Sequence, residues 1–463
     1  MVRKAYYDLM NWKNNNLRKP LIIYGSRQIG KTYLVLEVFA KDNFNNYIYI
    51  DFKIENEIRK YIKNHPKAID IINYLSLKFQ KVVTDDTLII FDEVQECLPA
   101  ITSLSDFYTN YPSIPVIATG SFVSMRVKMA NENEIALDNE IDSLNQDGSN
   151  NYRFPTGCVE ELNMYPLTFD EYLSTIDKKF YEELNETYLL NKRISNKNHN
   201  QAMKYFYDYL LIGGMPKAVD TFKRTNNYIM AREELKTIYN EFKNDMNYYQ
   251  KSLQSVNRSK MVFDNIYSQL NKENKNFKFS NIEAGKKYRD YEYPLDWLNE
   301  AGLIYPSFQM KEEVKKPLET TMMFKLYMPD TGLFAMQSNV SPDKFINDLT
   351  NNELSEIFTE NYIACELAAR GKKLYYWKGK TSSELEFLIE NDDELIPIET
   401  KRSRKSLDSL YKYRELNDNK LAIKLSNNKY CYSEENKVLT LPYYYLPFYL
   451  NELCKKIDVK NNW

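Results

Sequence analysis

An eight-residue stretch near the N-terminus has the residue types and spacing of a phosphate-binding loop. It is Gly25-Ser26-Arg27-Gln28-Ile29-Gly30-Lys31-Thr32, which matches the Walker A pattern G-x-x-x-x-G-K-[ST] between an apolar run and a helical pattern. Backbone N–H groups of such a loop surround phosphates, Lys31 reaches the β- and γ-phosphates, and Thr32 can ligate Mg²⁺. We therefore expect all eight residues to bind nucleotide, with Lys31 also contributing to catalysis.

Two adjacent carboxylates follow a second buried apolar run. Asp92 and Glu93 end the stretch 88–93, in the manner of a Walker B motif. Phosphoryl transfer to water requires a carboxylate that holds Mg²⁺ through water, here Asp92, and one that orients and deprotonates the attacking water, here Glu93. Paired acids at a strand end can also be solvated caps, but the preceding loop favours the catalytic interpretation.

A third apolar run ends in hydroxyl side chains that could sense the γ-phosphate. Thr119 and Ser121 are the candidates, although a simple strand-to-loop turn explains the same residues equally well. Arg126 and Arg153 are the nearest candidates for an arginine that stabilises transition-state charge, and surface exposure is the alternative for each.

A second set of acidic residues occurs in the C-terminal part of the chain. Glu360 falls on an expected helix, Glu386 on a strand, and Glu399 and Lys401 flank one position on the next strand. Alternation along that strand sends Glu399 and Lys401 to the same face. Three carboxylates with a lysine suit one Mg²⁺ and an activated water, as in a nuclease. An ordinary charged strand edge, or a site without activity, remains the alternative.

A basic cluster with aromatic neighbours lies between these two sets. Lys286, Lys287 and Arg289 stand beside Tyr288 and Tyr291, a combination that can contact phosphates and bases. A solvated surface explains the same composition.

The amino-acid composition disfavours several classes of function. The 62 basic and 64 acidic residues give a net charge of −2, so nucleic-acid binding would need a local basic patch. Two histidines, and five cysteines without a CxxC pair, disfavour histidine-based catalysis, a zinc module and a disulfide framework. The N-terminus is too polar for a secretory signal, and no run approaches the ~18 apolar residues of a membrane helix. We expect a soluble cytoplasmic protein without a membrane partner.

The order of expected elements changes along the chain. The first 160 residues alternate strands and helices, which predicts a parallel α/β sheet, and 130–151 is an acidic, Asn-rich loop or lid. Helical patterns dominate from 165 onward, and 258–308 has a helix-helix-strand order that suits a winged helix. From 358 a helix, three strands and another helix predict an α+β unit with its own core.

These motifs together resemble the prokaryotic AAA-type ATPases that carry a C-terminal domain of unknown function similar to PD-(D/E)xK nucleases. The resemblance implies an AAA core at 1–160, a helical lid at 161–250, a winged-helix-like region at 251–345 and a nuclease-like domain at 346–463. Two positions depart from the pattern: Cys158 replaces a common basic residue, and Glu386 replaces the usual aspartate. The motifs in order are W-x-x-x-x-x-R-K-P, GSRQIGKT, FDEVQ, ATGS, YPLTFDEYL, YLLIGGMP, WLNEAGLI, FKLYMPDTGLF, FTENYIACEL, YYWKG, ELEF and IPIETK.

The sequence therefore predicts an ATP-binding protein, a Mg²⁺-dependent ATPase whose nucleotide cycle controls a nuclease-like or nucleic-acid-binding effector domain. The competing hypothesis is a nucleotide sensor or scaffold that does not hydrolyse ATP and binds a protein partner. ATP and Mg²⁺ are the expected cofactors. DNA or RNA, a protein partner and a homo-oligomer stay open as partners.

Overall fold

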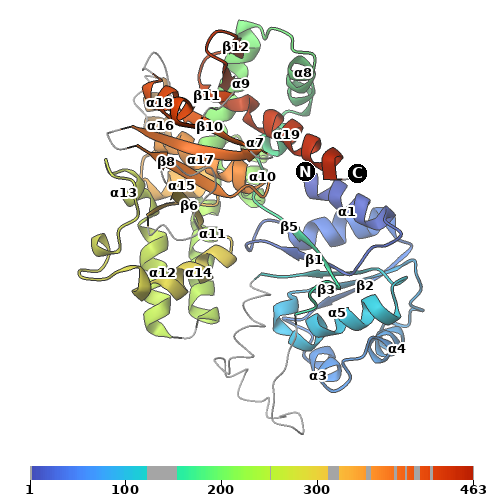
Figure 1. Ribbon diagram of the computed structural model, residues 1–463. Helices are drawn as coiled ribbons and strands as arrows, with labels where there is room; N and C mark the ends of the chain where they lie inside the picture. Colours follow the sequence, from blue (N-terminus) through green and yellow to red (C-terminus); the bar gives the residue numbers. More distant parts are fainter. Residues whose placement is uncertain are drawn as a thin grey trace. The chain divides into compact units, whose positions relative to one another are not determined.

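The computed structural model describes residues 3–121, 154–250, 252–310, 323–350, 356–379, 383–391, 394–400, 407–417 and 421–461 (Figure 1). The chain forms two compact units, residues 2–165 and 166–463. The expected loop at 130–151, both candidate arginines (Arg126 and Arg153) and Lys401 lie outside the described residues. Among the residues described, no helix has the length and apolar character needed to cross a membrane.

The N-terminal unit is built on a five-stranded parallel sheet with the order β2-β3-β4-β1-β5. Strand β4 lies between β1 and β3 and is parallel to both, so the carboxyl ends of these three strands lie side by side. This sheet confirms the predicted α/β architecture. Its strands are β1 (Leu21–Tyr24), β2 (Asn46–Asp51), β3 (Thr87–Asp92), β4 (Val116–Thr119) and β5 (Glu160–Asn163).

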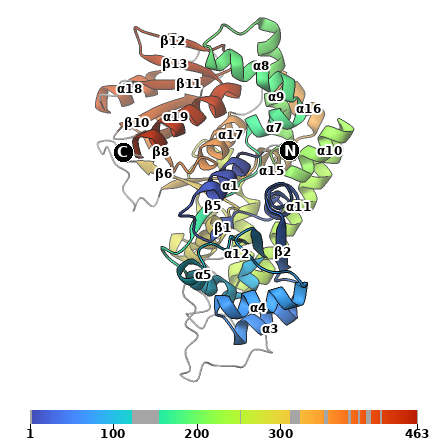
Figure 2. The ribbon, with the colours of Figure 1, turned by 90° about the vertical axis from the view of Figure 1, so that its right-hand side faces the viewer.

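Helices cover both faces of this sheet, with α1 and α5 on opposite sides (Figures 1 and 2). Every residue of β3 is buried, as expected for a central strand of a parallel sheet. The helical elements are α1 (Lys4–Asn14), the π-helical η1 (Tyr33–Ala40), α2 (Lys41–Asn43), α3 (Asn56–Asn64), α4 (Ala68–Phe79), the 3₁₀ turn η2 (Val94–Glu96) and α5 (Leu98–Asn110).

The second unit begins with the helices that the sequence predicted. Local capping starts several of them: Thr168 and Glu171 form a capping box at α7, and the side chains of Ser195 and Asn227 cap α9 and α11. These helices are α7 (Phe169–Ile176), α8 (Lys178–Leu189), α9 (Asn196–Ile212), α10 (Pro216–Thr225) and α11 (Tyr228–Tyr249).

An eight-stranded mixed sheet forms the centre of the second unit, in the order β12-β13-β11-β10-β9-β8-β6-β7. Its strands are β6 (Tyr305–Met310), β7 (Phe324–Tyr327), β8 (Leu374–Lys378), β9 (Glu384–Asn391), β10 (Glu394–Thr400), β11 (Ala422–Ser426), β12 (Cys431–Ser433) and β13 (Val438–Pro442). The remaining helical elements are α12 (Leu253–Asp264), α13 (Ile266–Leu270), η3 (Phe279–Asn281), η4 (Tyr288–Asp290), α14 (Glu292–Glu300), α15 (Thr331–Gln337), α16 (Pro342–Thr350), α17 (Ile357–Ala368), α18 (Asp408–Asn417), η5 (Tyr443–Tyr445) and α19 (Leu446–Asn461).

The region expected to be a separate winged helix shares this sheet. Strand β6 pairs in parallel with β8 and antiparallel with β7, so the hairpin β6–β7 is an edge of the eight-stranded sheet. The expected boundary between 345 and 346 therefore passes through one continuous sheet. The local pattern identified the helices and the strand, but strand partners distant in sequence cannot be read from it.

Two glycine-containing motifs meet at one buried aspartate. The Asp330 carboxylate accepts a hydrogen bond from the N–H of Gly214 at 2.6 Å and caps α15 through the N–H of Leu333 at 2.9 Å. Burial raises the pKa of Asp330 to about 6. A Cβ atom at Gly214 would lie 2.0 Å from the carbonyl oxygen of Leu167, so glycine is required there by close backbone approach.

We predict that Gly214→Ala lowers the free energy of unfolding by about 3 kcal/mol, because the backbone must move to admit the methyl group. The matched control is Gly285→Ala, where a Cβ would meet no atom within 4 Å and only a φ of +76° opposes the change. That control should cost about 1 kcal/mol. Urea denaturation of both variants measures the difference, and equal costs would contradict the close-approach explanation.

Candidate nucleotide-binding site

The loop from Gly25 to Thr32 connects β1 to the helical segment that contains η1. Its backbone has positive φ at Gly25 (142°), Gln28 (66°) and Gly30 (85°). A Cβ at Gly25 would lie 2.3 Å from the carbonyl oxygen of Met164 on the segment after β5. The loop conformation thus depends on glycine at position 25, and it turns the chain directly into a helix N-terminus.

Lys31 is held inside this loop. Its side chain is only 8% exposed, and Nζ donates to the carbonyl oxygens of Gly25 at 2.8 Å and Ser26 at 2.9 Å. The ammonium is therefore fixed beside the N–H groups at the start of the helix. A terminal phosphate is the ligand that this combination of charge and donors fits.

Asp92, at the end of β3, collects hydrogen bonds from three neighbouring segments. The hydroxyl of Thr32 donates to one carboxylate oxygen at 2.8 Å, and the hydroxyl of Tyr49 on β2 donates to the same oxygen at 2.9 Å. The other oxygen accepts from the hydroxyl of Thr119 and from the N–H of Glu93. The predicted residues Thr32, Asp92 and Thr119 are thus brought together.

The hydrogen bond from Tyr49 to Asp92 is a contact that the sequence did not indicate. Burial, followed by the charge of Asp92, raises the pKa of Tyr49 far above its usual value, so the phenol remains a hydrogen-bond donor. Only the register of β2 against β3, in which Asp51 pairs with Asp92, could have pointed to it.

The oxygens of Thr32 and Asp92 fit a magnesium ion that shares its shell with water and phosphate. Both are hard oxygen ligands, and their separation of 2.8 Å brings them within reach of a single cation. Mg²⁺ in nucleotide sites is typically bound by one or two protein oxygens together with phosphates. The donor set therefore agrees with the role predicted for these two residues.

The carboxylate of Glu93 is engaged by two side chains. Arg27 Nη2 lies 3.7 Å from Glu93 Oε2, and the side-chain amide of Gln95 donates to the same oxygen. Glu93 also has a left-handed backbone with φ of 52°, which turns the chain sharply after β3. Arg27 was predicted to bind nucleotide, and its contact with Glu93, like the role of buried Gln95, was not foreseen.

Ser121 differs from Thr119, the other predicted sensor. Its hydroxyl is buried and has no hydrogen-bond partner among the described residues, whereas Thr119 reaches Asp92. The structure thus brings Thr119 into the hydrogen-bonded centre of the site.

Comparison with known proteins gives three family-model matches. Residues 17–135 match a model described as an AAA domain. The N-terminal segment is a P-loop AAA domain. Residues 203–344 and 356–444 match two different domains of unknown function, DUF8612 and DUF4143. Neither description names a nuclease or a winged helix.

Individual relatives are distant. An uncharacterized protein of Methanocaldococcus jannaschii is 24% identical over 392 residues, which covers 82% of this chain and 74% of that protein. Among solved structures, a DNA replication initiation factor is 16% identical. The match covers 65% of this chain and 79% of that protein, with a TM-score of 0.25. The replication initiator DnaA bound to AMPPCP and single-stranded DNA is 17% identical. The match covers 57% of this chain and 78% of that protein, with a TM-score of 0.27. TM-scores this low carry no argument about this chain.

We predict that Tyr49→Phe lowers the free energy of unfolding of the N-terminal unit by about 2 kcal/mol, because a buried carboxylate loses a donor. Tyr47→Phe is the control, since it removes a hydroxyl on the same strand for which the described residues show no hydrogen bond. Chemical denaturation followed by circular dichroism compares the two variants. A Tyr49→Phe variant as stable as the control would show that the hydrogen bond from Tyr49 to Asp92 does not stabilise the unit.

The carboxylates predicted for the C-terminal site are all buried. Glu360 lies on α17, Glu386 on β9 and Glu399 on β10. Glu386 accepts the N–H of Thr400 at 3.2 Å. Within the described ranges, no group of three or more acidic, histidine or cysteine side chains is arranged to hold a metal ion. The ion site expected at Glu360, Glu386, Glu399 and Lys401 stays a prediction, since Lys401 lies outside the described residues.

Two lysines that the sequence did not indicate lie against Glu360 and against Glu384, an acid outside the predicted set. Lys275, from the connection between α13 and η3, pairs with Glu360, and the fully buried Lys325 of β7 pairs with Glu384. Burial opposes ionisation of Glu360, yet the ammonium groups of Lys275 and Lys325 hold the pKa of this carboxyl below its usual value. Lysines of the protein thus compensate Glu360, one of the three carboxylates for which the sequence predicted a metal.

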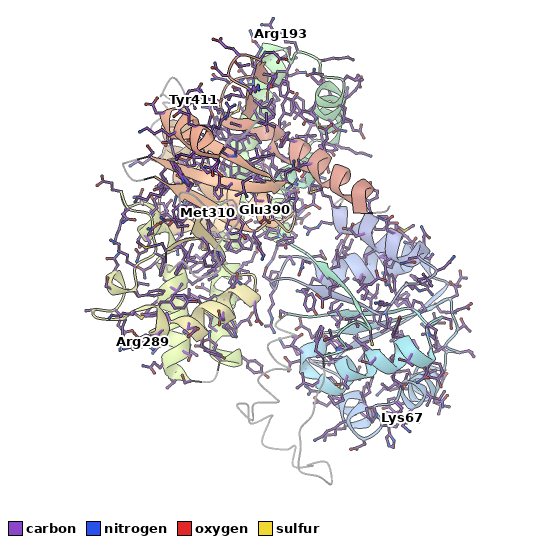
Figure 3. All side chains as sticks on the ribbon, viewed as in Figure 1. Lys67, Arg193, Arg289, Met310, Glu390 and Tyr411 are labelled. Carbon is purple, nitrogen blue, oxygen red and sulfur yellow. The ribbon has the colours of Figure 1, made fainter. Side chains whose placement is uncertain are left out.

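The expected basic and aromatic cluster is largely occupied by internal contacts. Tyr291 is fully buried and its hydroxyl donates to Glu283 at 3.1 Å, so its predicted availability to nucleic-acid bases is wrong. Lys286 lies within 4.0 Å of both Glu283 and Asp290. Arg289 is exposed on the surface (Figure 3).

We predict that Lys275→Met destabilises the second unit by about 3 kcal/mol, because the buried carboxylate of Glu360 loses its ion-pair partner and keeps only the charge of Lys325 nearby. Adding Glu360→Gln to the same chain should recover most of that loss. Lys286→Met is the control and should cost about 1 kcal/mol or less, since its partners are at the surface. Denaturation of the parent, Lys275→Met, Glu360→Gln and the double variant forms a double-mutant cycle, and additive effects would exclude the ion pair.

Proposed function

We propose that this protein is a Mg²⁺-dependent ATPase whose catalytic site lies in the N-terminal AAA domain. The observation that carries the proposal is the convergence of Thr32 and Thr119 on the carboxylate of Asp92. A surface loop with a chance match to the pattern would have no reason to share hydrogen bonds with the end of β3.

Each residue has a role that follows from its position. The loop N–H groups and Lys31 would bind the phosphates, while Thr32 and Asp92 would hold the ion. Mg²⁺, when bound, neutralises charge on the β- and γ-phosphate oxygens. Glu93 takes the proton of the attacking water as the bond from the γ-phosphorus to ADP breaks. For this step Glu93 has to exchange its contacts with Arg27 and Gln95 for the water.

We also propose that the nucleotide cycle controls the second unit as an effector. The compensation of Glu360 by Lys275 and Lys325 favours a binding function over metal-dependent cleavage of nucleic acid. DNA or RNA, and a protein partner, are therefore the partners to test, with binding as the measured property.

A second candidate is a nucleotide sensor that binds ATP without turnover. The engagement of Glu93 by Arg27 and Gln95 favours it, because a carboxylate held in this way does not act on water. The two candidates differ in one measurable quantity, the rate of ATP hydrolysis.

Release of phosphate from ATP by the full chain tests the proposal. Lys31→Ala should abolish tight ATP binding, whereas Glu93→Gln should retain binding and lose roughly 10²-fold or more in turnover, because the amide cannot accept a proton. Glu37→Gln, at an exposed position of the same unit, is the matched control and should behave as the parent. Tight binding of ATP with no turnover by the parent would establish the sensor instead.

A further inference from the structure

A cavity of about 580 Å³ lies in the second unit, and no residue of the Gly25–Thr32 loop lines it. The connection between α8 and α9 forms one wall, and the loop between β11 and β12, with η5 and α19, forms the other. Figures 1 and 2 both show α8 and β12 side by side at this end of the unit. A volume in this range accommodates a small organic ligand.

Three basic side chains line the cavity: Lys192, Arg193 and Lys429. Lys429 Nζ donates to the carbonyl oxygen of Ile194 at 3.1 Å, which joins the two walls. Arg193 is exposed at this end of the unit (Figure 3), and within the described ranges it makes no hydrogen bond or ion pair. A cation without a protein partner beside a cavity favours an anionic ligand.

One carboxylate, that of Glu452, also lines the cavity. It accepts a hydrogen bond from the hydroxyl of Tyr188 at 3.1 Å. Lys192 also lies 3.5 Å from the carboxylate of Glu186 outside the lining. Three cations against two carboxylates still leave the cavity positively charged in a chain whose net charge is −2.

Three tyrosines supply aromatic surface to the same cavity. The rings of Tyr188 and Tyr445 have centroids 5.0 Å apart, and those of Tyr188 and Tyr430 have centroids 6.4 Å apart in an edge-to-face arrangement. Tyr430 is 40% exposed, so part of its ring is open to a ligand. Exposed aromatic rings beside cations form the usual platform on which nucleic-acid bases stack.

The hydroxyl of Tyr445 independently points to a ligand. Tyr445 is 2% exposed, and its hydroxyl has no hydrogen-bond partner among the described residues. A buried hydroxyl without a partner is unfavourable, and a ligand that accepts its proton removes that penalty. Burial raises the pKa of Tyr445, so the group stays a donor.

We propose that this cavity binds one nucleotide unit, a base with its phosphate, either as a free nucleotide or within single-stranded nucleic acid. Arg193 and Lys192 contact the phosphate, Tyr430 stacks on the base, and Tyr445 donates to the ligand. A tyrosine-phosphorylated peptide would use the cations equally well, but it has less use for a ring open to stacking. The inference goes beyond the ATPase proposal, because no residue of the Gly25–Thr32 loop takes part.

The experiment uses the full chain carrying Lys31→Ala, which removes nucleotide binding by the loop. Binding of fluorescein-labelled oligo(dT) is followed by fluorescence anisotropy at low salt, and binding of thymidine monophosphate by calorimetry. Tyr430→Ala should weaken binding roughly five- to hundredfold, as expected for loss of one stacking contact. The matched control is Tyr432→Ala, which removes a tyrosine of similar exposure that does not line the cavity, and it should leave binding unchanged.

Two further variants test the polar contacts. Arg193→Ala should weaken binding and reduce its dependence on salt, whereas Lys197→Ala, on the nearby α9, should change neither. Tyr445→Phe should weaken binding without lowering the melting temperature of the free protein, because the hydroxyl has no partner to lose there. A variant that lost stability as well would indicate a structural hydroxyl and contradict this contact.

The two probes separate the sources of the ligand. Binding of oligo(dT) alone assigns the cavity to single-stranded nucleic acid, and binding of the monophosphate assigns it to a free nucleotide. No binding of either probe overturns the proposal, and so does binding of a tyrosine-phosphorylated peptide in their place. If the ATPase proposal fails, parent and Lys31→Ala chains should still bind the probe equally, whereas loss of probe binding in Lys31→Ala would assign it to the loop.

Discussion

The hydrogen bonds of the Asp92 carboxylate are the constraint on which the N-terminal unit depends. Burial of a carboxylate is costly unless hydrogen-bond donors surround it. Here the donors are Thr32 at the end of the Gly25–Thr32 loop, Tyr49 on β2 and Thr119 on β4. In the observed order, β4 lies between β1 and β3, and Thr32 and Thr119 both reach Asp92. The strand order and the geometry of the candidate site are therefore linked through one carboxylate.

Buried charge organises the second unit in a comparable way. Arg370 pairs with Glu366 at 2.6 Å and lies 3.8 Å from Asp170, which joins α17 to α7 across a long separation in sequence. The same Glu366 accepts the N–H of Phe169 at 2.7 Å, at the start of α7. Asp330 in turn connects the turn after α9 to the start of α15. Charged groups thus fix how the helices meet, because each would be costly if left unpaired.

The sequence was sufficient for the features that local pattern encodes. The loop from Gly25 to Thr32, the acids after β3 and the strands and helices of both units follow from spacing, apolar runs and capping residues. Tyr49, Gln95 and Lys275 could not be predicted, because each contact depends on strand register or on chain segments far apart. The sharing of one sheet by β6 and β8 was missed for the same reason.

The ion site expected at Glu360, Glu386, Glu399 and Lys401 stays a prediction, but the structure adds partners that the motif did not indicate. Lys275 pairs with Glu360, and Lys325 also lowers the pKa of that carboxyl. The compensating lysines come from before β6 and from β7, which local reasoning assigned to a different domain. The structure therefore shows that the charge of Glu360 is balanced by lysines from other segments of the same unit.

The position of β6 and β7 at one edge of the mixed sheet has a consequence for synthesis of the chain on the ribosome. This hairpin is made well before its neighbour β8, and an isolated two-stranded hairpin is only marginally stable in water. Its hydrogen-bonding edge therefore stays open while α15, α16 and α17 emerge. The second unit can complete its sheet only when nearly the whole chain has left the exit tunnel, so its folding is late and depends on distant contacts.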